Sequence, residues 1–315
     1  MKIPLKTMDM RPKGQVVGCG VQGNNCLALS LSQGKAGKWS IKWSLAGELG
    51  DLDFAARLSR LTGSRHFWVS PSEEGGLQVD TARAIEILDA SLIKKGPRKD
   101  FFLTQIRSRF VNETIVVGGL GVKGVGMENG VATKSVHNVG GGAIKDNVQR
   151  DYRNWYSRMN IRRPHIASTA LALANAYLAL YPAEKRLANP IRLVLLKGRS
   201  VYRAILMDDW KYVDEVLLPR MEGDDASKSV IEGRMNGWID YFKRQHPALL
   251  SGREDRIDPL VISVKETHVS DYEHWDLWGE HAMEKIDMTG DVAEAILSNR
   301  DIAPIAFGMA LQGGC

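Results

Sequence analysis

The chain has 315 residues, of which 44% are hydrophobic and 25% are charged, and its formal net charge is +5. These values are ordinary for a soluble globular protein with room for one large or two medium domains. The modest positive charge is not concentrated in one basic stripe, so the composition does not predict nucleic-acid binding.

Cysteine content and hydropathy indicate the cellular compartment in which the protein is expected. The three cysteines, Cys19, Cys26 and Cys315, form no CxxC pair, so neither a disulfide framework nor a zinc ribbon is indicated and a reducing cytoplasm fits. The first ten residues lack the apolar core of a signal peptide, and the longest apolar candidate, 166–180, is too short and polar to span a bilayer. We therefore expect a cytoplasmic protein that is recruited to any membrane on which it acts.

The first half of the chain begins with a strand–turn–strand pattern at 16–31, in which an apolar run reaches glycines and a short polar stretch before a second apolar run. This pattern is typical of a β-hairpin. Further elements are predicted from period-2 or helical spacing: strands at 39–45, 66–69, 114–117 and 131–139, and helices at 52–61, 80–94, 146–159 and 166–181.

The second half opens with a matching hairpin pattern at 191–206. Strands are then predicted at 212–217 and 260–264, and helices at 226–245, 292–297 and 302–311. Two matching hairpins, each followed at a distance by an alanine-rich helix, predict a duplicated α/β protein with two lobes and a cleft between them.

A glycine motif lies in the first hairpin. The stretch 18–23 reads GCGVQG and matches the G-x-G-x-x-G fingerprint of dinucleotide-binding folds. That fold needs a helix directly after the glycines and an acid at the end of the next strand, and only Glu48 lies near that position. A glycine turn between two strands is the preferred interpretation, and an NAD(P)-dependent oxidoreductase using this motif stays open as an alternative.

Three histidines, His268, His274 and His281, lie near one another in the sequence among acidic residues. Their spacing is irregular, and metal ligands are usually set on regular elements. A polar surface loop is the preferred interpretation, and no metal site is predicted.

The order of elements resembles the actin-like superfamily, and within it the PilM pilus assembly proteins and the cytoplasmic domain of GspL. Four stretches carry this resemblance: 155–177, 192–219, 238–245 and 303–311. It implies an α/β, two-lobed actin-like (duplicated ribonuclease H-like) fold with an inserted small subdomain. The first lobe would be 1–185 with the insertion at about 80–160, and the second 186–315 with a C-terminal helix that returns to the first lobe.

The chain departs from the active members of this superfamily, which place an aspartate just before the glycine of each phosphate hairpin to orient Mg²⁺ and water. Here Val17 precedes Gly18 and Lys197 precedes Gly198. The resemblance therefore implies a degraded nucleotide cleft with no catalytic residue and no required cofactor, and an active ATPase or kinase that binds Mg-ATP is the alternative. The residues that would mark the remnant of this cleft are Gly18, Gly20, Gly23, Lys197, Gly198 and Ser200.

The function implied by the resemblance is a scaffold of a type IV pilus or type II secretion-like platform, peripheral to the inner membrane on its cytoplasmic side. It would bind the cytoplasmic tail of a PilN-like inner-membrane protein, and self-association stays open. A groove is expected within 80–160, where a helix would present apolar side chains near basic ones. The residues assigned to this groove are Ile85, Leu88, Leu92, Arg107 and Arg109.

Overall fold

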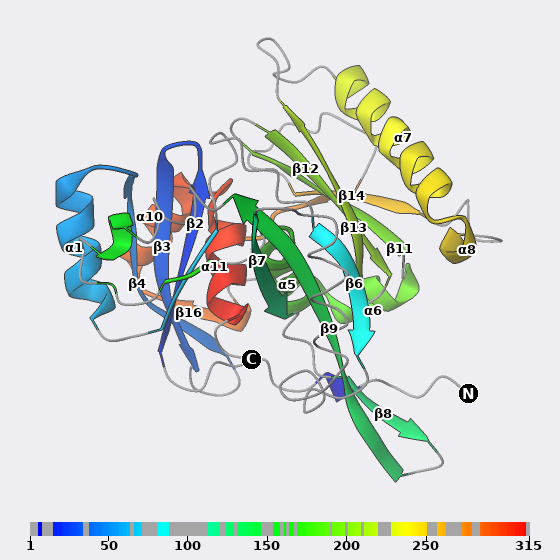
Figure 1. Cartoon of the computed structure of the whole chain (residues 1–315), viewed down its shortest axis with the longest axis horizontal. Helices are drawn as coiled ribbons and strands as arrows, with labels where there is room; N and C mark the ends of the chain where they lie inside the picture. Colours follow the sequence, from blue (N-terminus) through cyan, green and yellow to red (C-terminus); the bar gives the residue numbers. More distant parts are fainter. Residues whose placement is uncertain are drawn as a thin grey trace.

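Two β-sheets lie on either side of a pair of buried helices in the computed structural model of the chain (Figure 1). The structure describes residues 6–7, 15–33, 38–63, 66–70, 81–87, 113–119, 124–128, 131–145, 154–157, 161, 164–166, 169–189, 191–198, 201–208, 211–219, 228–250, 257–262, 273–278 and 284–312.

The first sheet contains the first predicted hairpin, and its strand order is β10-β5-β2-β3-β4-β16. Strands β2, β3 and β4 form an antiparallel meander, β5 and β10 run parallel to β2, and β16 runs parallel to β4 at the far edge. The bounds are β2 Val16–Gln22, β3 Asn25–Gln33, β4 Trp39–Glu48, β5 His66–Val69, β10 His165–Ile166 and β16 Ile286–Met288. Because β16 comes from near the C-terminus, the chain returns to the first sheet before its last helix.

The second sheet contains the second predicted hairpin, in the order β13-β12-β11-β14-β15. Strands β11, β12 and β13 are antiparallel, and β14 and β15 run parallel to β11. The bounds are β11 Ile191–Lys197, β12 Val201–Asp208, β13 Lys211–Pro219, β14 Asp258–Ile262 and β15 Glu273–Trp275.

The two sheets share one topology. In each, three antiparallel strands are followed by two strands parallel to the first, in the spatial order third, second, first, fourth, fifth. The predicted duplication is therefore confirmed. The same finding contradicts the dinucleotide-binding alternative, because a turn at Gly23–Asn24 and an antiparallel strand follow the glycine motif where that fold requires a helix.

Helices cover the outer faces of both sheets (Figure 1). On the first sheet, α1 (Leu52–Thr62) buries Phe54 and Leu58, and its first turn is capped by the Asp51 carboxylate, which accepts from the Asp53 N–H at 2.9 Å. On the second sheet, α7 (Lys228–Gln245) packs Met235, Trp238 and Phe242 against the strands. The short helices are α6 Ala183–Ala188, α8 Pro247–Leu250 and α10 Gly290–Ser298.

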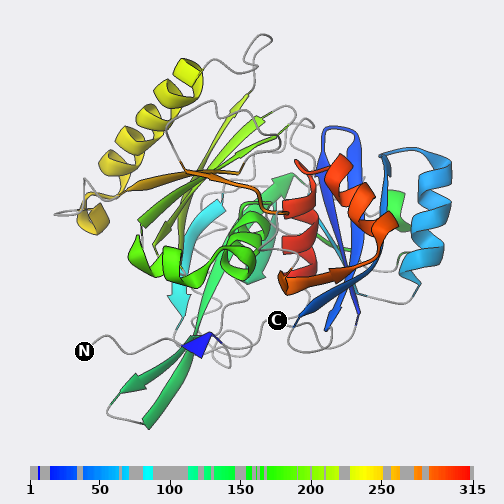
Figure 2. The same cartoon turned by 180° about the vertical axis from the view of Figure 1, so that it is seen from behind.

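Two further helices, α5 (Thr169–Leu180) and α11 (Ala303–Gln312), lie between the sheets, as Figure 1 and the reverse view in Figure 2 both show. Every side chain of α5 is buried. One hydrophobic cluster runs from the first sheet through both helices to the second sheet. The small residues of α5 allow close packing, because Gly308 of α11 rests directly on the backbone of Ala172.

The segment inserted in the first lobe between β5 and β10 is built of strands wherever the structure describes it over 81–145. The long strand β9 (Val131–Lys145) pairs with β6 (Thr81–Ile87), β7 (Glu113–Gly119) and β8 (Gly124–Glu128), and β8 also pairs with β1 (Lys6–Thr7). In Figure 1 β9 and β8 extend away from the two lobes, whereas β6 lies beside β13.

The predicted helix at 80–94 is wrong over 81–87, where β6 forms. Its alanines and its apolar spacing favour a helix locally, but pairing with β9 supplies the backbone hydrogen bonds instead. An irregularity of register between Ala82 and Ile85 also interrupts the period-2 alternation that would have marked a strand in the sequence. The remainder of that predicted helix lies outside the described residues, as does most of the helix predicted at 146–159, of which 154–157 are helical.

No helix in the part of the chain that the structure describes is both long enough and apolar enough to cross a bilayer.

Candidate functional site

The two hairpin tips between the lobes form the candidate site. The first tip turns at Gly23–Asn24, where Gly23 has a φ of 58° and Gln22 pairs with Asn25. At the second tip the N–H of Gly198 donates to the carbonyl of Val201 at 2.9 Å. Glycine supplies the left-handed conformation that the first turn requires.

The side chain of Gln22 joins the two tips. It is 2% exposed, and its Nε2 donates to the backbone carbonyl of Asp301, just before α11, at 3.3 Å. A Cβ atom added at Gly198 would lie 2.9 Å from Nε2 and 3.2 Å from Oε1 of Gln22. The Gln22 amide at the first tip therefore lies against Gly198 at the second tip.

The first two glycines of the GCGVQG motif face α11. A Cβ atom at Gly18 would lie 2.1 Å from the carbonyl oxygen of Ala306, and one at Gly20 would lie 2.8 Å from that of Ile302. Real Cβ contacts are not this short, so these positions are glycine because a helix backbone presses on the strand. The α11 backbone therefore covers this face of β2.

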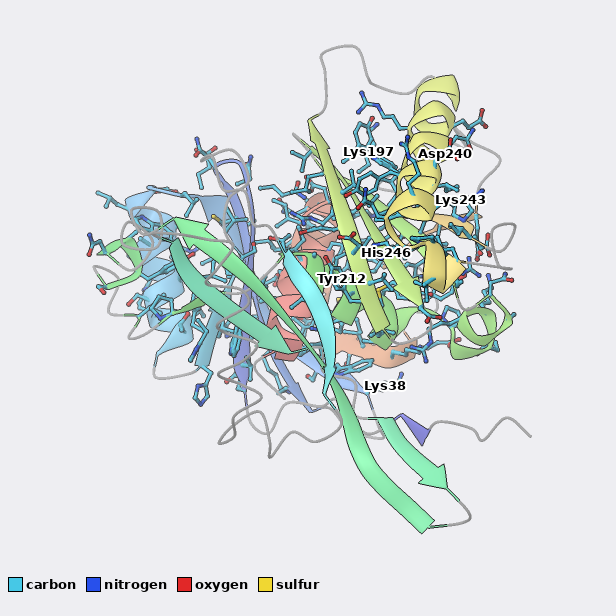
Figure 3. All side chains as sticks on the ribbon, turned by 45° about the vertical axis from the view of Figure 1, so that its right-hand side comes forward. Lys38, Lys197, Tyr212, Asp240, Lys243 and His246 are labelled. Atoms are coloured by element: carbon cyan, nitrogen blue, oxygen red, sulfur yellow. The ribbon has the colours of Figure 1, made fainter. Side chains whose placement is uncertain are left out.

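Lys197 does not join the other cleft residues. It pairs with Tyr202, and both lie on the face of the second sheet that α7 covers, where Tyr202 packs near Trp238 and the Arg234 guanidinium lies 4.9 Å from the Tyr202 ring. In Figure 3 Lys197 lies close to α7. Strand alternation thus turns the Lys197 side chain away from the first lobe. Ser200, the other polar residue assigned to the second tip, lies outside the described residues.

The nearest acidic residue after the second hairpin in the sequence, Asp208, is at the wrong end of its strand. Asp208 pairs with Ile191 at the start of β11, whereas the tip follows the pair formed by Lys197 and Tyr202. Six residues of strand separate the two ends, which is about 20 Å. Asp208 therefore cannot hold a metal ion or a water molecule at the hairpin tips.

Sequence reasoning missed two residues of this contact, Gln22 and Asp301. Gln22 carried one usable signal, since it is the polar residue next to the turn and shares a strand face with Gly18 and Gly20. Asp301 carried none, because it contributes a backbone carbonyl from 279 positions away.

Of the residues assigned to a partner groove, the structure describes only Ile85, whose backbone lies in β6. Leu88, Leu92, Arg107 and Arg109 lie outside the described residues. Among the three histidines, only the backbone of His274 is described, in β15.

A polar cluster lies at the end of the second sheet opposite the hairpin tip. Arg192 is 1% exposed, and its Nη1 lies 2.8 Å from Glu273 and 3.0 Å from Asp258. Glu273 also accepts hydrogen bonds from Tyr181 at 2.9 Å and Lys185 at 3.1 Å. The cluster therefore ties the segment after α5 to β11, β14 and β15.

Two pKa values in this cluster report the same pairing. Burial would raise the pKa of Glu273, but its hydrogen bonds from Arg192, Lys185 and Tyr181 outweigh burial and hold that pKa below its ordinary value. Burial raises the pKa of the Tyr181 hydroxyl, and its bond to Glu273 raises it further. The carboxylate thus stays ionised and the phenol stays protonated at neutral pH.

No protein-family model matches the sequence, and no curated protein matches it either. Among solved structures, a chain of the PilM-PilN type IV pilus biogenesis complex aligns with a TM-score of 0.53 at 13% identity, over 96% of this chain and 99% of that one. A Bacteroides thetaiotaomicron protein with an actin-like ATPase fold aligns with a TM-score of 0.39 at 10% identity, over 91% of this chain and 96% of that one. The ethanolamine utilization protein EutJ from Carboxydothermus hydrogenoformans aligns with a TM-score of 0.36 at 9% identity, over 96% of this chain and 91% of that one. With its duplicated sheets and a whole-length match to the PilM-PilN structure, the chain has the two-lobed actin-like fold.

Proposed function

We propose that this chain is a PilM-like scaffold of a type IV pilus or type II secretion-like platform, held at the cytoplasmic face of the inner membrane by a partner. The observation that carries the proposal is the whole-length structural match to a chain of the PilM-PilN complex, which leaves neither protein with a large unmatched domain. Peripheral placement fits a chain whose described helices include no membrane span.

The proposed partner is the cytoplasmic tail of a PilN-like inner-membrane protein. In the sheet inserted in the first lobe, the described strands β6 and β7 each pair with β9 along one edge, and an extended peptide can add a strand along the other edge. This sheet takes the place of the helix that the sequence predicted for the groove.

A pull-down of the full chain with that tail tests the partner. The bait is the tail of the single-span inner-membrane protein encoded beside this gene, and the matched control is the same tail with its sequence scrambled. Retention by the native tail alone is expected. If the full-length, folded chain is retained equally by both baits, or by neither, the proposed partner is wrong.

We further infer that the scaffold does not hydrolyse ATP. The α11 backbone on Gly18 and Gly20, the Gln22 side chain at Gly198, and the distance of Asp208 from the tips support this. Without a carboxylate to position Mg²⁺, phosphoryl transfer loses its main electrostatic support.

Mg-ATP is accordingly expected to leave the thermal midpoint of the chain unchanged. A ligand present at 100 times its dissociation constant stabilises the folded state by about 2.7 kcal/mol, which corresponds to about 4 °C for a chain of this size. Thermal scans at millimolar Mg-ATP, with Mg-AMP as the control nucleotide, measure this. A rise of several degrees with Mg-ATP alone, together with phosphate release, would instead support the active ATPase.

A further inference from the structure

We propose that Gln22 is an inter-lobe latch, whose amide side chain lies between the two hairpin tips and holds them together. The contact brings together three segments that are remote in sequence: the end of β2 in the first sheet, the turn after β11 in the second sheet, and Asp301, which lies two residues before the start of α11. The inference depends on this geometry alone, so it stands or falls independently of the pilus partner.

The position of Gln22 on its strand aims it at the second lobe. Val17, Cys19 and Val21 alternate toward the α1 side of the sheet, so Gln22 shares the opposite face with Gly18 and Gly20. On that face α11 covers the two glycines, and the Gln22 side chain continues past the helix to the second hairpin. The Asp301 carbonyl fixes the amide by accepting its hydrogen bond at 3.3 Å.

The absence of a side chain at Gly198 is what lets the tips meet. Gly198 is buried, and an added Cβ atom would fall 2.8 Å from the Val201 carbonyl of its own hairpin as well as 2.9 Å from the Gln22 amide. Any larger residue would have to displace Gln22 or open the lobes.

The latch acts at the hairpin tips, whereas α5 and α11 join the two sheets through the buried core. The hydrophobic cluster that includes both helices is continuous from one sheet to the other. Lobe opening would therefore separate the hairpin tips before it disturbed the buried helices.

Hydrogen exchange on Gln22→Ala and on the matched control Gln245→Ala tests the latch in the full chain without nucleotide. Gln245 is exposed at the end of α7, so its loss should leave both tips unchanged. In Gln22→Ala, exchange is expected to rise about tenfold in peptides covering both tips, 19–27 and 195–204, although the substitution lies only in the first. A rise confined to 19–27, or no rise in either peptide, would overturn the latch.

A second variant separates the contact from local effects on the second hairpin. Gly198→Ala is expected to lower the thermal midpoint, and this loss should be smaller in the Gln22→Ala background, where the methyl group has room. The clash with Val201 remains in both backgrounds, so the rescue is partial. Equal losses in the two backgrounds would show that Gln22 and Gly198 do not act on each other.

Discussion

Replacement of Gly308 by alanine is expected to lower the free energy of unfolding by more than about 3 kcal/mol, or to prevent folding altogether. The added methyl would lie 1.8 Å from the carbonyl oxygen and 2.4 Å from the carbonyl carbon of Ala172. These are backbone atoms of α5, whose side chains are all buried, so the helix cannot move aside without disturbing the core shared by the two lobes. Urea denaturation followed by circular dichroism measures the loss.

Gly237→Ala is the matched control, because Gly237 is also a helical glycine but has nothing within 4 Å of an added Cβ atom. That substitution should stabilise the chain by about 1 kcal/mol, since alanine has the higher helix propensity. If Gly308→Ala were tolerated as well as Gly237→Ala, the close crossing of α5 and α11 would be wrong.

Replacement of Arg192 by methionine is expected to destabilise the chain by about 2–3 kcal/mol. Loss of one partner from a fully buried ion pair would cost more, but the two carboxylates that pair with Arg192 are partly exposed. Methionine keeps most of the aliphatic volume but removes the guanidinium between Glu273 and Asp258, whose side chains are 31% and 34% exposed. Arg57→Met is the control. Arg57 and Asp53 are 3.9 Å apart and largely exposed, so that change should cost less than about 0.5 kcal/mol.

The dependence of stability on acid pH provides a second test of the ion pairs around Arg192. The folded pKa of Glu273 lies below its unfolded value, so its pairing contributes stability above about pH 4.3 and the contribution is lost as the pH falls through the folded pKa. The difference between wild type and Arg192→Met should therefore narrow below about pH 4. A difference that stays constant from pH 7 to pH 3 would mean that lost packing, and not lost pairing, explains the effect.

The fold was predictable from the sequence where the local residue pattern agrees with the strand pairing in the structure. Both hairpins show apolar runs on either side of a glycine turn, and each is closed by its own neighbouring strand, so the information is local. The helix α5 was recognisable from its run of alanines and leucines before Pro182. The error at 81–87 arose because β6 pairs with β9, a partner about 50 residues away that the local pattern does not reveal.

The candidate site was harder to predict, because a glycine reports only that something approaches the backbone closely. At Gly18 and Gly20 the sequence suggested a phosphate, and the structure places α11 there. Nothing in the sequence distinguishes these two cases, since the helix arrives from nearly 300 residues away. The face of Lys197 was readable from strand alternation, because Leu193 and Leu195 share its parity and pack beneath α7.

Isothermal titration of the whole chain with the cytoplasmic tail of the proposed PilN-like partner, with and without Mg-ATP, tests the proposal of a nucleotide-independent scaffold most directly. We expect saturable binding with the same dissociation constant in both conditions, because the proposed latch holds the hairpin tips together through the Gln22 side chain. A tail that binds only with Mg-ATP, or with an affinity changed more than about tenfold by it, would show coupling of at least about 1.4 kcal/mol between nucleotide and partner and would contradict the account.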